Sequence, residues 1–438
     1  MSKVKFKIKI LKKICAATLS LALVVVGLFP VNIVTAKSQI IPNDETGIPD
    51  KYLYQEILYE LDKKSDGKFT KEEAARVYRL DINYAGKKKV KTLKGIENLV
   101  NLLSLEIHDN SLTSLKGVEG LVNLQTLKIG KGNLKNLNEV KDLPKLKELS
   151  VEGNKIEDWT VVSDLTNLEN LRISDCGLTG SGLEKVVSKL TGLTSLEVSK
   201  SCLEDLKSIS GLTKLETLNV SNNKLKSLSG LETLTELHSL YISNNKLTKL
   251  TGIENLTGLL NVYANNNNLA NVKEVENLIR LEILDVSKNE IAKLPSLKKH
   301  INLNLEYSSF FYNKISEKEF KKNLPSHVPT WWINNQVLLQ NLEKKLKINS
   351  VKKIKSVTKK ITGVTEKKAT VVLMKSNGKK IKTVKANKKG AFSFKNLDLK
   401  KYKGKKLKVT AYLLYDDRIN GERHKQAIGT VRFSVRKK

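Results

Sequence analysis

The stretch Leu212-Thr-Lys-Leu-Glu-Thr-Leu-Asn-Val-Ser-Asn-Asn-Lys-Leu225 decides the fold, because its pattern repeats along most of the chain. Two aliphatic residues two positions apart, Leu218 and Val220, are followed by Asn223. Equivalent pairs return at steps of 22 or 25 residues: Leu80/Ile82, Leu105/Ile107, Leu127/Ile129, Leu149/Val151, Leu171/Ile173, Leu196/Val198, Leu218/Val220, Leu240/Ile242, Val262/Ala264 and Leu284/Val286. Such a run of matches does not arise by chance, so we expect one repeat array over residues 80–302.

The consensus of the array, L-x-x-L-x-L-x-x-N-x-L at a period of 22, is that of a leucine-rich repeat. A spacing of two is the period of a β-strand, so both members of each pair point inward and the residue between them points outward. One such strand cannot bury its apolar face, whereas stacked strands form a parallel sheet with a continuous core. We therefore predict an α/β leucine-rich-repeat solenoid, a curved parallel sheet with a convex side of short helical or 3₁₀ segments.

An inward asparagine follows most pairs, at Asn110, Asn154, Asn223, Asn245, Asn267 and Asn289. Its amide can bond backbone groups that no strand ladder satisfies where the chain turns inward. Stacked repeats thus predict an asparagine ladder. Gly132, Cys176 and Ser201 occupy the same position and interrupt it, and we expect the solenoid to be locally softer there.

The convex side follows from the rest of each unit. In one 25-residue unit, four apolar residues fall on one helical face, at Leu183, Val186, Val187 and Leu190. The 22-residue units are too short for this and should return through a 3₁₀ turn or extended chain. Trp159 stands where other repeats carry a leucine (Leu115, Leu137, Leu228, Leu250), which favours a core position, with a binding role as the alternative.

Residues 1–36 have the composition of a secretory signal peptide. Six lysines precede an apolar run from Ile14 to Phe29, and Val34-Thr35-Ala36 offers small residues for cleavage. A retained membrane anchor is the alternative, but the run is short and breaks at Pro30. No other stretch approaches the length of a membrane span, and we expect the mature chain to be secreted without a transmembrane anchor.

The cysteines indicate neither a disulfide nor a zinc site. Cys176 lies in the inward ladder position and Cys202 one place past the equivalent position, so their side chains should diverge. Neither belongs to a metal-binding motif with histidine.

Residues 37–79 predict a helical cap over the first repeat. Leu53, Ile57 and Leu61 form one helical stripe, and Thr70 to Glu73 form a capping box that opens a second helix with Ala74, Val77 and Tyr78. The connecting segment fits part of a calcium loop through Asp62, Asp66, Thr70 and Glu73. Lys64 places a positive charge where that loop needs an oxygen ligand, so a cap without metal is favoured over calcium binding, and no cofactor is expected.

After Leu284 the pattern decays. Leu303 and Leu305 suggest one last shortened strand, and the aromatic residues of 303–350, among them Phe320, Trp331 and Trp332, predict a C-terminal cap. An exposed tryptophan pair that binds sugar is the alternative. Residues 351–438 contain short alternating runs, with Asn377-Gly378 as a hairpin turn between two of them, and indicate an all-β Ig-like sandwich.

The charge is concentrated in the last segment. Residues 343–438 contain 31 Lys and Arg against 6 Asp and Glu, a net charge of +25, whereas the formal charge of the whole chain is +33. This density favours polyanions such as teichoic acid or a glycosaminoglycan, with Lys379, Lys380, Lys388, Lys389, Lys405 and Lys406 as contacts. A solvated basic surface is the alternative. No motif for specific nucleic-acid binding is present.

The outward strand positions form columns on the concave face. One column contains Glu106, Lys128, Arg172, Asn219, Tyr241, Tyr263 and Asp285, and the next contains His108 and Asn265. Tyr241 and Tyr263 should be stacked neighbours about 5 Å apart. We predict that they form the centre of a ligand site flanked by Arg172 and Asp285, or alternatively that they only shield the sheet.

The repeat sequence, the preceding cap and the segments Ile361-Thr-Gly-Val-Thr-Glu-Lys-Lys-Ala369 and Lys389-Gly-Ala-Phe-Ser-Phe394 together resemble the bacterial internalin family. The resemblance implies a protein of a Gram-positive bacterium, of the adhesin or virulence type, that binds a host or surface protein through the concave face as a monomer. The chain has no sorting sequence or wall-binding repeat of that family, so its basic end is a candidate tether.

Catalysis has little support in the sequence. The five histidines, His108, His238, His300, His327 and His424, do not lie in hydrolase or metalloprotease motifs. Two hypotheses remain: a binding protein that uses the concave face, and a cell-wall retention protein whose activity lies in the basic β-domain.

Overall fold

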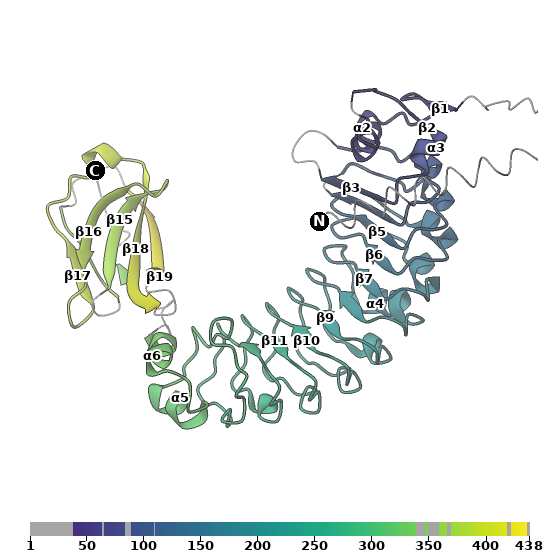
Figure 1. Cartoon of the computed structure of the whole chain (residues 1–438). Coiled ribbons are helices and arrows are strands. Elements are labelled where there is room, and N and C mark those ends of the chain that lie inside the picture. Colours follow the sequence, from purple (N-terminus) through teal and green to yellow (C-terminus); the bar gives the residue numbers. More distant parts are fainter. Residues whose placement is uncertain are drawn as a thin grey trace, which may run out of the picture.

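The computed structural model describes residues 38–63, 65–83, 89–108, 110–338, 347–348, 359–365, 369–417 and 422–435. The expected signal peptide, residues 1–36, lies outside them. Figure 1 shows a curved array of repeats whose strands line the inner side, with a β-domain beyond its C-terminal end.

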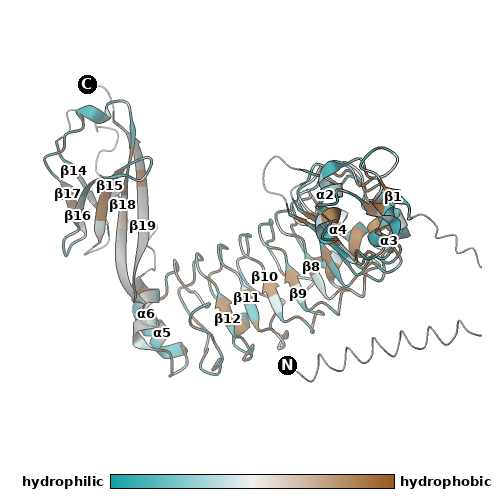
Figure 2. Ribbon diagram, turned by 45° about the horizontal axis from the view of Figure 1, so that its top comes forward, coloured by the Kyte–Doolittle hydropathy of each residue, from teal (hydrophilic) through white to brown (hydrophobic). Residues whose placement is uncertain are grey.

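One parallel sheet runs through the array. It contains β3 (Arg79–Asn83), β4 (Ser104–His108), β5 (Thr126–Ile129), β6 (Glu148–Ser150), β7 (Asn170–Arg172), β8 (Ser195–Glu197), β9 (Thr217–Asn219), β10 (Ser239–Tyr241), β11 (Asn261–Tyr263) and β12 (Ile283–Asp285). The register aligns the first residue of each apolar pair with that of the next, as in Leu105 against Leu127. These residues are buried in one continuous core, so the predicted solenoid is confirmed. In Figure 2 the strands β8 to β12 lie side by side along the array.

The asparagine ladder is present and shares its acceptors between repeats. Asn245 Nδ2 donates to the carbonyls of Ile242 in its own repeat and Val220 in the preceding repeat, both at 3.1 Å. Its Oδ1 accepts the N–H of Leu225 at 3.0 Å. Where the asparagine is replaced, part of this pattern is lost: Cys176 Sγ donates to the Val151 carbonyl at 3.3 Å but provides no comparable acceptor.

Gly132 is the tightest of the ladder substitutions. A Cβ at this position would lie 2.6 Å from Asn110 Oδ1 and 2.7 Å from Asn154 Oδ1. Glycine has no side chain that could accept the N–H of Leu112, as the asparagine of the following repeat does elsewhere. Asn110 Oδ1 accepts this N–H instead, within its own repeat. The softness expected across these repeats stays a prediction.

The convex side consists of short turns, as predicted. Most of the 3₁₀ segments are three to five residues long: η1 (Ile96–Asn98), η2 (Val118–Gly120), η3 (Asn138–Asp142), η4 (Thr160–Asp164), η5 (Lys207–Ile209) and η6 (Lys273–Val275). One of the two 25-residue units contains α4 (Gly180–Val187), whose Leu183, Val186 and Val187 are buried. Leu190, which was expected on the same helical face, lies beyond the end of α4 and is also buried. Trp159 packs in the core, which confirms that it is structural.

The N-terminal cap consists of β1 (Ile40–Ile41), α2 (Lys51–Glu60), β2 (Phe69–Thr70) and α3 (Lys71–Ala74). Asp50 caps α2 and the capping box of Thr70 and Glu73 is formed. The expectation that Val77 and Tyr78 belong to the second helix is wrong, because α3 ends at Ala74 and the chain must enter β3 at Arg79. Val77 is nevertheless buried, whereas Tyr78 is exposed.

The C-terminal end of the array differs from the expected strand at Leu303 and Leu305. That prediction is wrong, because continued 22-residue spacing would place Glu306 inward. The chain instead turns at residues 305–307, Ser308 and Phe310 become buried, and Ser309 forms a parallel bridge with Asp285. Asn313 then extends the ladder by donating to the Val286 carbonyl at 2.9 Å.

Two helices close this end, α5 (Glu317–Asn323) and α6 (Thr330–Leu338). Phe310, Phe320 and Trp332 pack edge to face, and Trp332 Nε1 donates to the Leu305 carbonyl at 2.8 Å. The predicted aromatic cap is confirmed for Trp332. The side chain of Trp331 lies outside the described part of the chain.

The β-domain is a sandwich of two antiparallel sheets. One contains β13 (Lys347–Ile348), β14 (Ile361–Val364) and β17 (Ala391–Phe394), and the other contains β15 (Thr370–Lys375), β16 (Lys380–Lys385), β18 (Lys406–Asp417) and β19 (Glu422–Ser434). The predicted hairpin at Asn377-Gly378 joins β15 to β16. Phe311 and Tyr312 of the last repeat pack against the core of this domain. Cys176 is buried, Cys202 is exposed, and neither forms a disulfide.

Candidate functional site

The concave face collects the residues that the period predicted. Successive strands align Glu106 with Lys128, Arg172 with Glu197, and Tyr241 with Tyr263. His108 and Asn265 lie in the neighbouring column. The concave face divides into two parts of different chemistry. One is a charged half on β3 to β8, and the other is a tyrosine half comprising Asn219, Tyr241, Asn261, Tyr263, Asn265, Asp285 and Tyr307.

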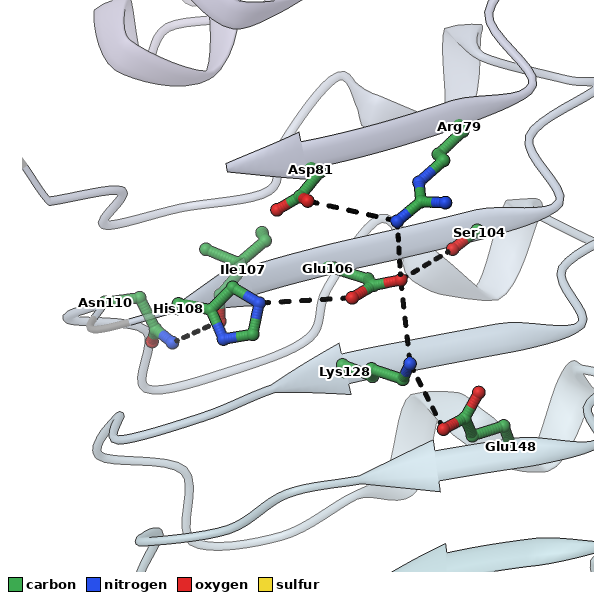
Figure 3. A network of polar contacts seen from close by, with 9 residues as sticks. All are labelled: Arg79, Asp81, Ser104, Glu106, Ile107, His108, Asn110, Lys128 and Glu148. Carbon is green, nitrogen blue, oxygen red and sulfur yellow. Dashed lines mark hydrogen bonds and ion pairs between the residues drawn. The ribbon is translucent and has the colours of Figure 1, made fainter. Parts of the chain in front are cut away.

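The charged half is a network of ion pairs across strands (Figure 3). Glu106 accepts from Arg79 at 3.3 Å and lies 3.6 Å from Lys128 Nζ, and Lys128 continues to Glu148 at 3.1 Å. His108 Nε2 is 4.0 Å from the second oxygen of Glu106. Most of these charges are satisfied within the sheet, so this half presents a fixed polar surface.

Arg172 is more available, because it is exposed and its Nη1 lies 4.0 Å from Glu197 Oε2. Burial, together with the negative charge of Glu152, raises the pKa of Glu197.

A hollow of about 430 Å³ lies at the ends of these strands. It exists because Gly130 has no side chain between His108 and Glu152, and Lys131 and Lys200 lie at its edge. Its floor is fixed by Ser199 Oγ, which donates to Ser174 Oγ at 2.9 Å.

In the tyrosine half, the rings of Tyr241 and Tyr263 are stacked with centroids 4.8 Å apart and planes 4° apart. Both side chains are half-buried. The surrounding amides are held in place: Asn219 donates to Glu197 at 3.1 Å, Asn261 donates to Ser239 Oγ at 3.1 Å, and Asn265 Oδ1 accepts from Ser243 Oγ. The predicted stacking is confirmed, while a binding role for the pair remains a prediction.

Asp285 closes the tyrosine half. Its Oδ1 accepts from Ser287 N at 3.0 Å and Ser287 Oγ at 2.7 Å. Burial raises the pKa of this carboxyl group. Burial likewise raises the pKa of Tyr263, with smaller contributions from Tyr241, Asp285 and Tyr307.

The calcium-loop candidates are arranged around a lysine. Lys63 Nζ lies 2.9 Å from Asp66 and 3.0 Å from Glu73, and Thr70 is occupied by the capping box. Asp62 adopts a left-handed backbone conformation with φ of 54°. The ammonium group of Lys63 thus neutralises two of the four candidates. Within the described residues, the His, Cys, Asp and Glu side chains form no group suited to a metal ion.

The six basic candidates are exposed but separate into two groups. Lys379 and Lys380 follow the β15–β16 turn, and the pairing of Lys375 with Leu407 brings the start of β18, with Lys405 and Lys406, to the same end. Lys388 and Lys389 lie after β16, at the opposite end of the sheet. Sequence reasoning did not select Lys375 and Lys401, whose ammonium groups lie over the Tyr402 ring at 5.9 and 5.6 Å.

The sequence analysis also missed Arg79, Glu148 and Tyr307. Arg79 and Glu148 each stand directly before the first apolar residue of a pair. This position forms a third outward column, which the repeat period could have identified. Tyr307 comes from the turn before Ser309 and carried no periodic signal.

Comparisons with known proteins agree with this architecture. Residues 213–255 match the family described as "Leucine Rich repeats (2 copies)", and residues 348–413 match "Bacterial Ig domain". An internalin from Listeria monocytogenes is similar in structure, with 28% sequence identity, a TM-score of 0.50, and coverage of 62% of this chain and 85% of that one. Internalin C2 from the same species shows 24% identity, a TM-score of 0.41, and coverage of 56% and 95%. No curated protein sequence matches the chain significantly.

The fold therefore defines a leucine-rich-repeat protein with a C-terminal bacterial Ig-like domain. More specifically, its architecture is similar to that of the internalin from Listeria monocytogenes. This fold is typically a non-enzymatic scaffold, and it supports a role in protein–protein interaction or ligand binding. Among the helices of the described residues, none has both the length and the apolar character needed to cross a bilayer.

Proposed function

We propose that the chain is a secreted protein of a Gram-positive bacterium, of the adhesin or virulence type, that binds a host or surface protein through its concave face. The observation that carries this proposal is the stacked pair Tyr241 and Tyr263 on the open side of the sheet. Half-buried aromatic residues provide contact area at a small entropic cost, and binding energy at interfaces concentrates on such anchors.

The two halves of the face would have different roles. The ion-pair network around Glu106 and Lys128 selects partners by their charge. It also influences the association rate, because fixed charges on a surface guide the approach of a partner more than they increase its affinity. Arg172 is an exposed basic group of the column that contains Tyr241 and Tyr263, and it is positioned to pair with an acidic group on the partner. The tyrosine half supplies the desolvated contact.

The test uses the full chain, immobilised, with host-cell surface protein and bacterial wall protein as separate inputs. The variant Tyr241→Ser/Tyr263→Ser should lose retention of a specific partner, because it removes both anchors while keeping the strand register. Tyr59→Ser, at an exposed tyrosine of α2, is the matched control and should retain it. Equal retention by both variants would contradict the proposal.

A second function is favoured by the basic end of the Ig-like domain. Lys379, Lys380, Lys405 and Lys406 lie exposed at one end of a sheet, where they form a concentrated positive surface for teichoic acid or a sulfated glycan. In this alternative the protein is retained on the cell wall and the repeats act as a spacer.

Charge reversal distinguishes the two ends of the sheet. Replacing these four lysines with Glu should lower the salt concentration that elutes the protein from heparin and from purified wall, since the binding is electrostatic. Lys388→Glu/Lys389→Glu changes charge at the opposite end and should have a smaller effect per residue. Equal effects per residue would indicate dependence on net charge alone.

A further inference from the structure

Within the tyrosine half, a large side chain lies next to a short one, and this difference in height forms a step on the surface. Since the rings of Tyr241 and Tyr263 are stacked, each ring has one covered face and one face directed to the next strand. Beyond Tyr263 the next residue in the column is Asp285, whose side chain is shorter. The outer face of the Tyr263 ring is therefore directed over the Asp285 carboxylate on the next strand. Tyr307 comes two residues before Ser309, which bridges to Asp285.

The carboxylate at the base of the step has a free acceptor. Asp285 Oδ1 receives both hydrogen bonds from Ser287, and Oδ2 accepts none from the described residues. This orientation is fixed, so Oδ2 is presented beside the ring at no further cost in side-chain entropy. The opposite step, beyond Tyr241, is different, because both polar atoms of Asn219 already have partners in Glu197 and Ser221.

The electrostatic surroundings select a neutral ligand. Positions 217–265 of the outward columns carry amide, hydroxyl and phenol groups without formal charge: Thr217, Asn219, Ser221, Ser239, Tyr241, Ser243, Asn261, Tyr263 and Asn265. An anionic ligand would be repelled by Asp285. Neutral hydroxyl groups suit these positions, because they can pair with the amide, hydroxyl and phenol groups.

We propose that the Tyr263–Asp285 step binds a neutral pyranose of a glycan. The C–H face of the sugar would pack on the outer face of the Tyr263 ring, and a pair of its hydroxyls would donate to Asp285 Oδ2. Tyr307, a residue that is 58% exposed, would offer its hydroxyl to a second sugar unit. This inference rests on the proposed function, in which the concave face is the binding surface. The recognised part of the partner would be its glycan.

Saturation-transfer NMR on the full chain tests the inference. The probes are the methyl glycosides of glucose, galactose, mannose and N-acetylglucosamine, together with cellotriose, mannotriose and chitotriose. At least one should show transfer from aromatic protons with millimolar affinity, and its trimer should bind more tightly. Tyr263→Ser should abolish transfer, Asp285→Asn should weaken binding at least about tenfold because Asn is a weaker, uncharged acceptor, and Tyr59→Ser should match the wild type.

Absence of transfer for every probe would overturn the inference, as would equal transfer in Tyr263→Ser and Tyr59→Ser. Unfolding midpoints of the variants establish that each is folded. Failure here is separable from failure of the proposed function: a protein partner that is retained equally before and after enzymatic deglycosylation supports the concave face and refutes the sugar.

Discussion

Replacing Asn245 with Ala should destabilise the solenoid more than any outward amide replacement. The side chain is buried at 8% exposure and links two repeats through its hydrogen bonds. Asn245 lies in the bend after β10, and it is not among the residues with positive φ, so alanine fits its backbone and the perturbation is confined to the loss of the amide.

The magnitude follows from which groups lose their last partner. The Val220 carbonyl keeps a donor, because Asn223 Nδ2 also donates to it at 3.0 Å, and the Ile242 carbonyl keeps Asn267 Nδ2. Only the N–H of Leu225 is left without its acceptor. An orphaned buried donor costs about 1–3 kcal/mol and each lost net bond about 0.5–1.5 kcal/mol, so we expect a loss of about 2–4 kcal/mol in the free energy of unfolding.

Urea unfolding followed by tryptophan fluorescence measures this quantity for the solenoid alone, because all three tryptophans, Trp159, Trp331 and Trp332, precede the Ig-like domain. The midpoint should fall while the slope stays constant. Asn219→Ala is the control: its amide is half-exposed, water can replace its bonds, and the expected loss is below about 1 kcal/mol. Equal losses for both variants would refute the ladder as the source of stability.

Further outcomes follow from other parts of the array. His300 is fully buried and burial lowers its pKa from the ordinary value of 6.5, so stability should fall as the pH drops below that value, and His300→Leu should remove this dependence in thermal unfolding. Trp332→Ala should cost about 3–5 kcal/mol in urea unfolding followed by circular dichroism, because it opens the C-terminal aromatic cluster. Burial raises the pKa of Glu197, so the wild type should lose stability as the pH rises through the raised pKa of this carboxyl group. Glu197→Gln should therefore have a higher melting temperature than the wild type at neutral pH and the same melting temperature in acid. Hydrogen exchange should be faster at the amides of Ile156 and Leu178, whose ladder neighbours are Cys176 and Ser201, than in repeats with asparagine; equal protection would show that the ladder gap is not soft.

The sequence period was sufficient for the sheet, because a two-residue spacing fixes which side chains point inward and stacking then fixes the register. For this reason the sequence alone pairs Tyr241 with Tyr263, as the structure shows. Prediction failed where the period ends. His300 takes a leucine position, and Glu306 cannot take the next inward position. The resulting turn contains Tyr307, two residues before Ser309, which bridges to Asp285.

Electrostatic detail was also beyond the sequence. The position of Lys63 between Asp66 and Glu73 depends on the path of the cap, although its sequence position beside Asp62 was visible. The split of the basic residues into two ends depends on how β15 pairs with β18. In both cases the sequence identifies the charged residues. Which of them lie close together depends on the path of the chain.

We expect the interruption of the asparagine ladder to divide the array into two blocks that unfold separately. Because each shared carbonyl transmits order from one repeat to the next, Gly132, Cys176 and Ser201 mark the place where partial melting should stop. Limited proteolysis near this boundary would release the C-terminal block intact, with its tyrosines still stacked. Recognition would then outlast damage to the N-terminal repeats, and a degraded molecule would remain a competitor for the same ligand.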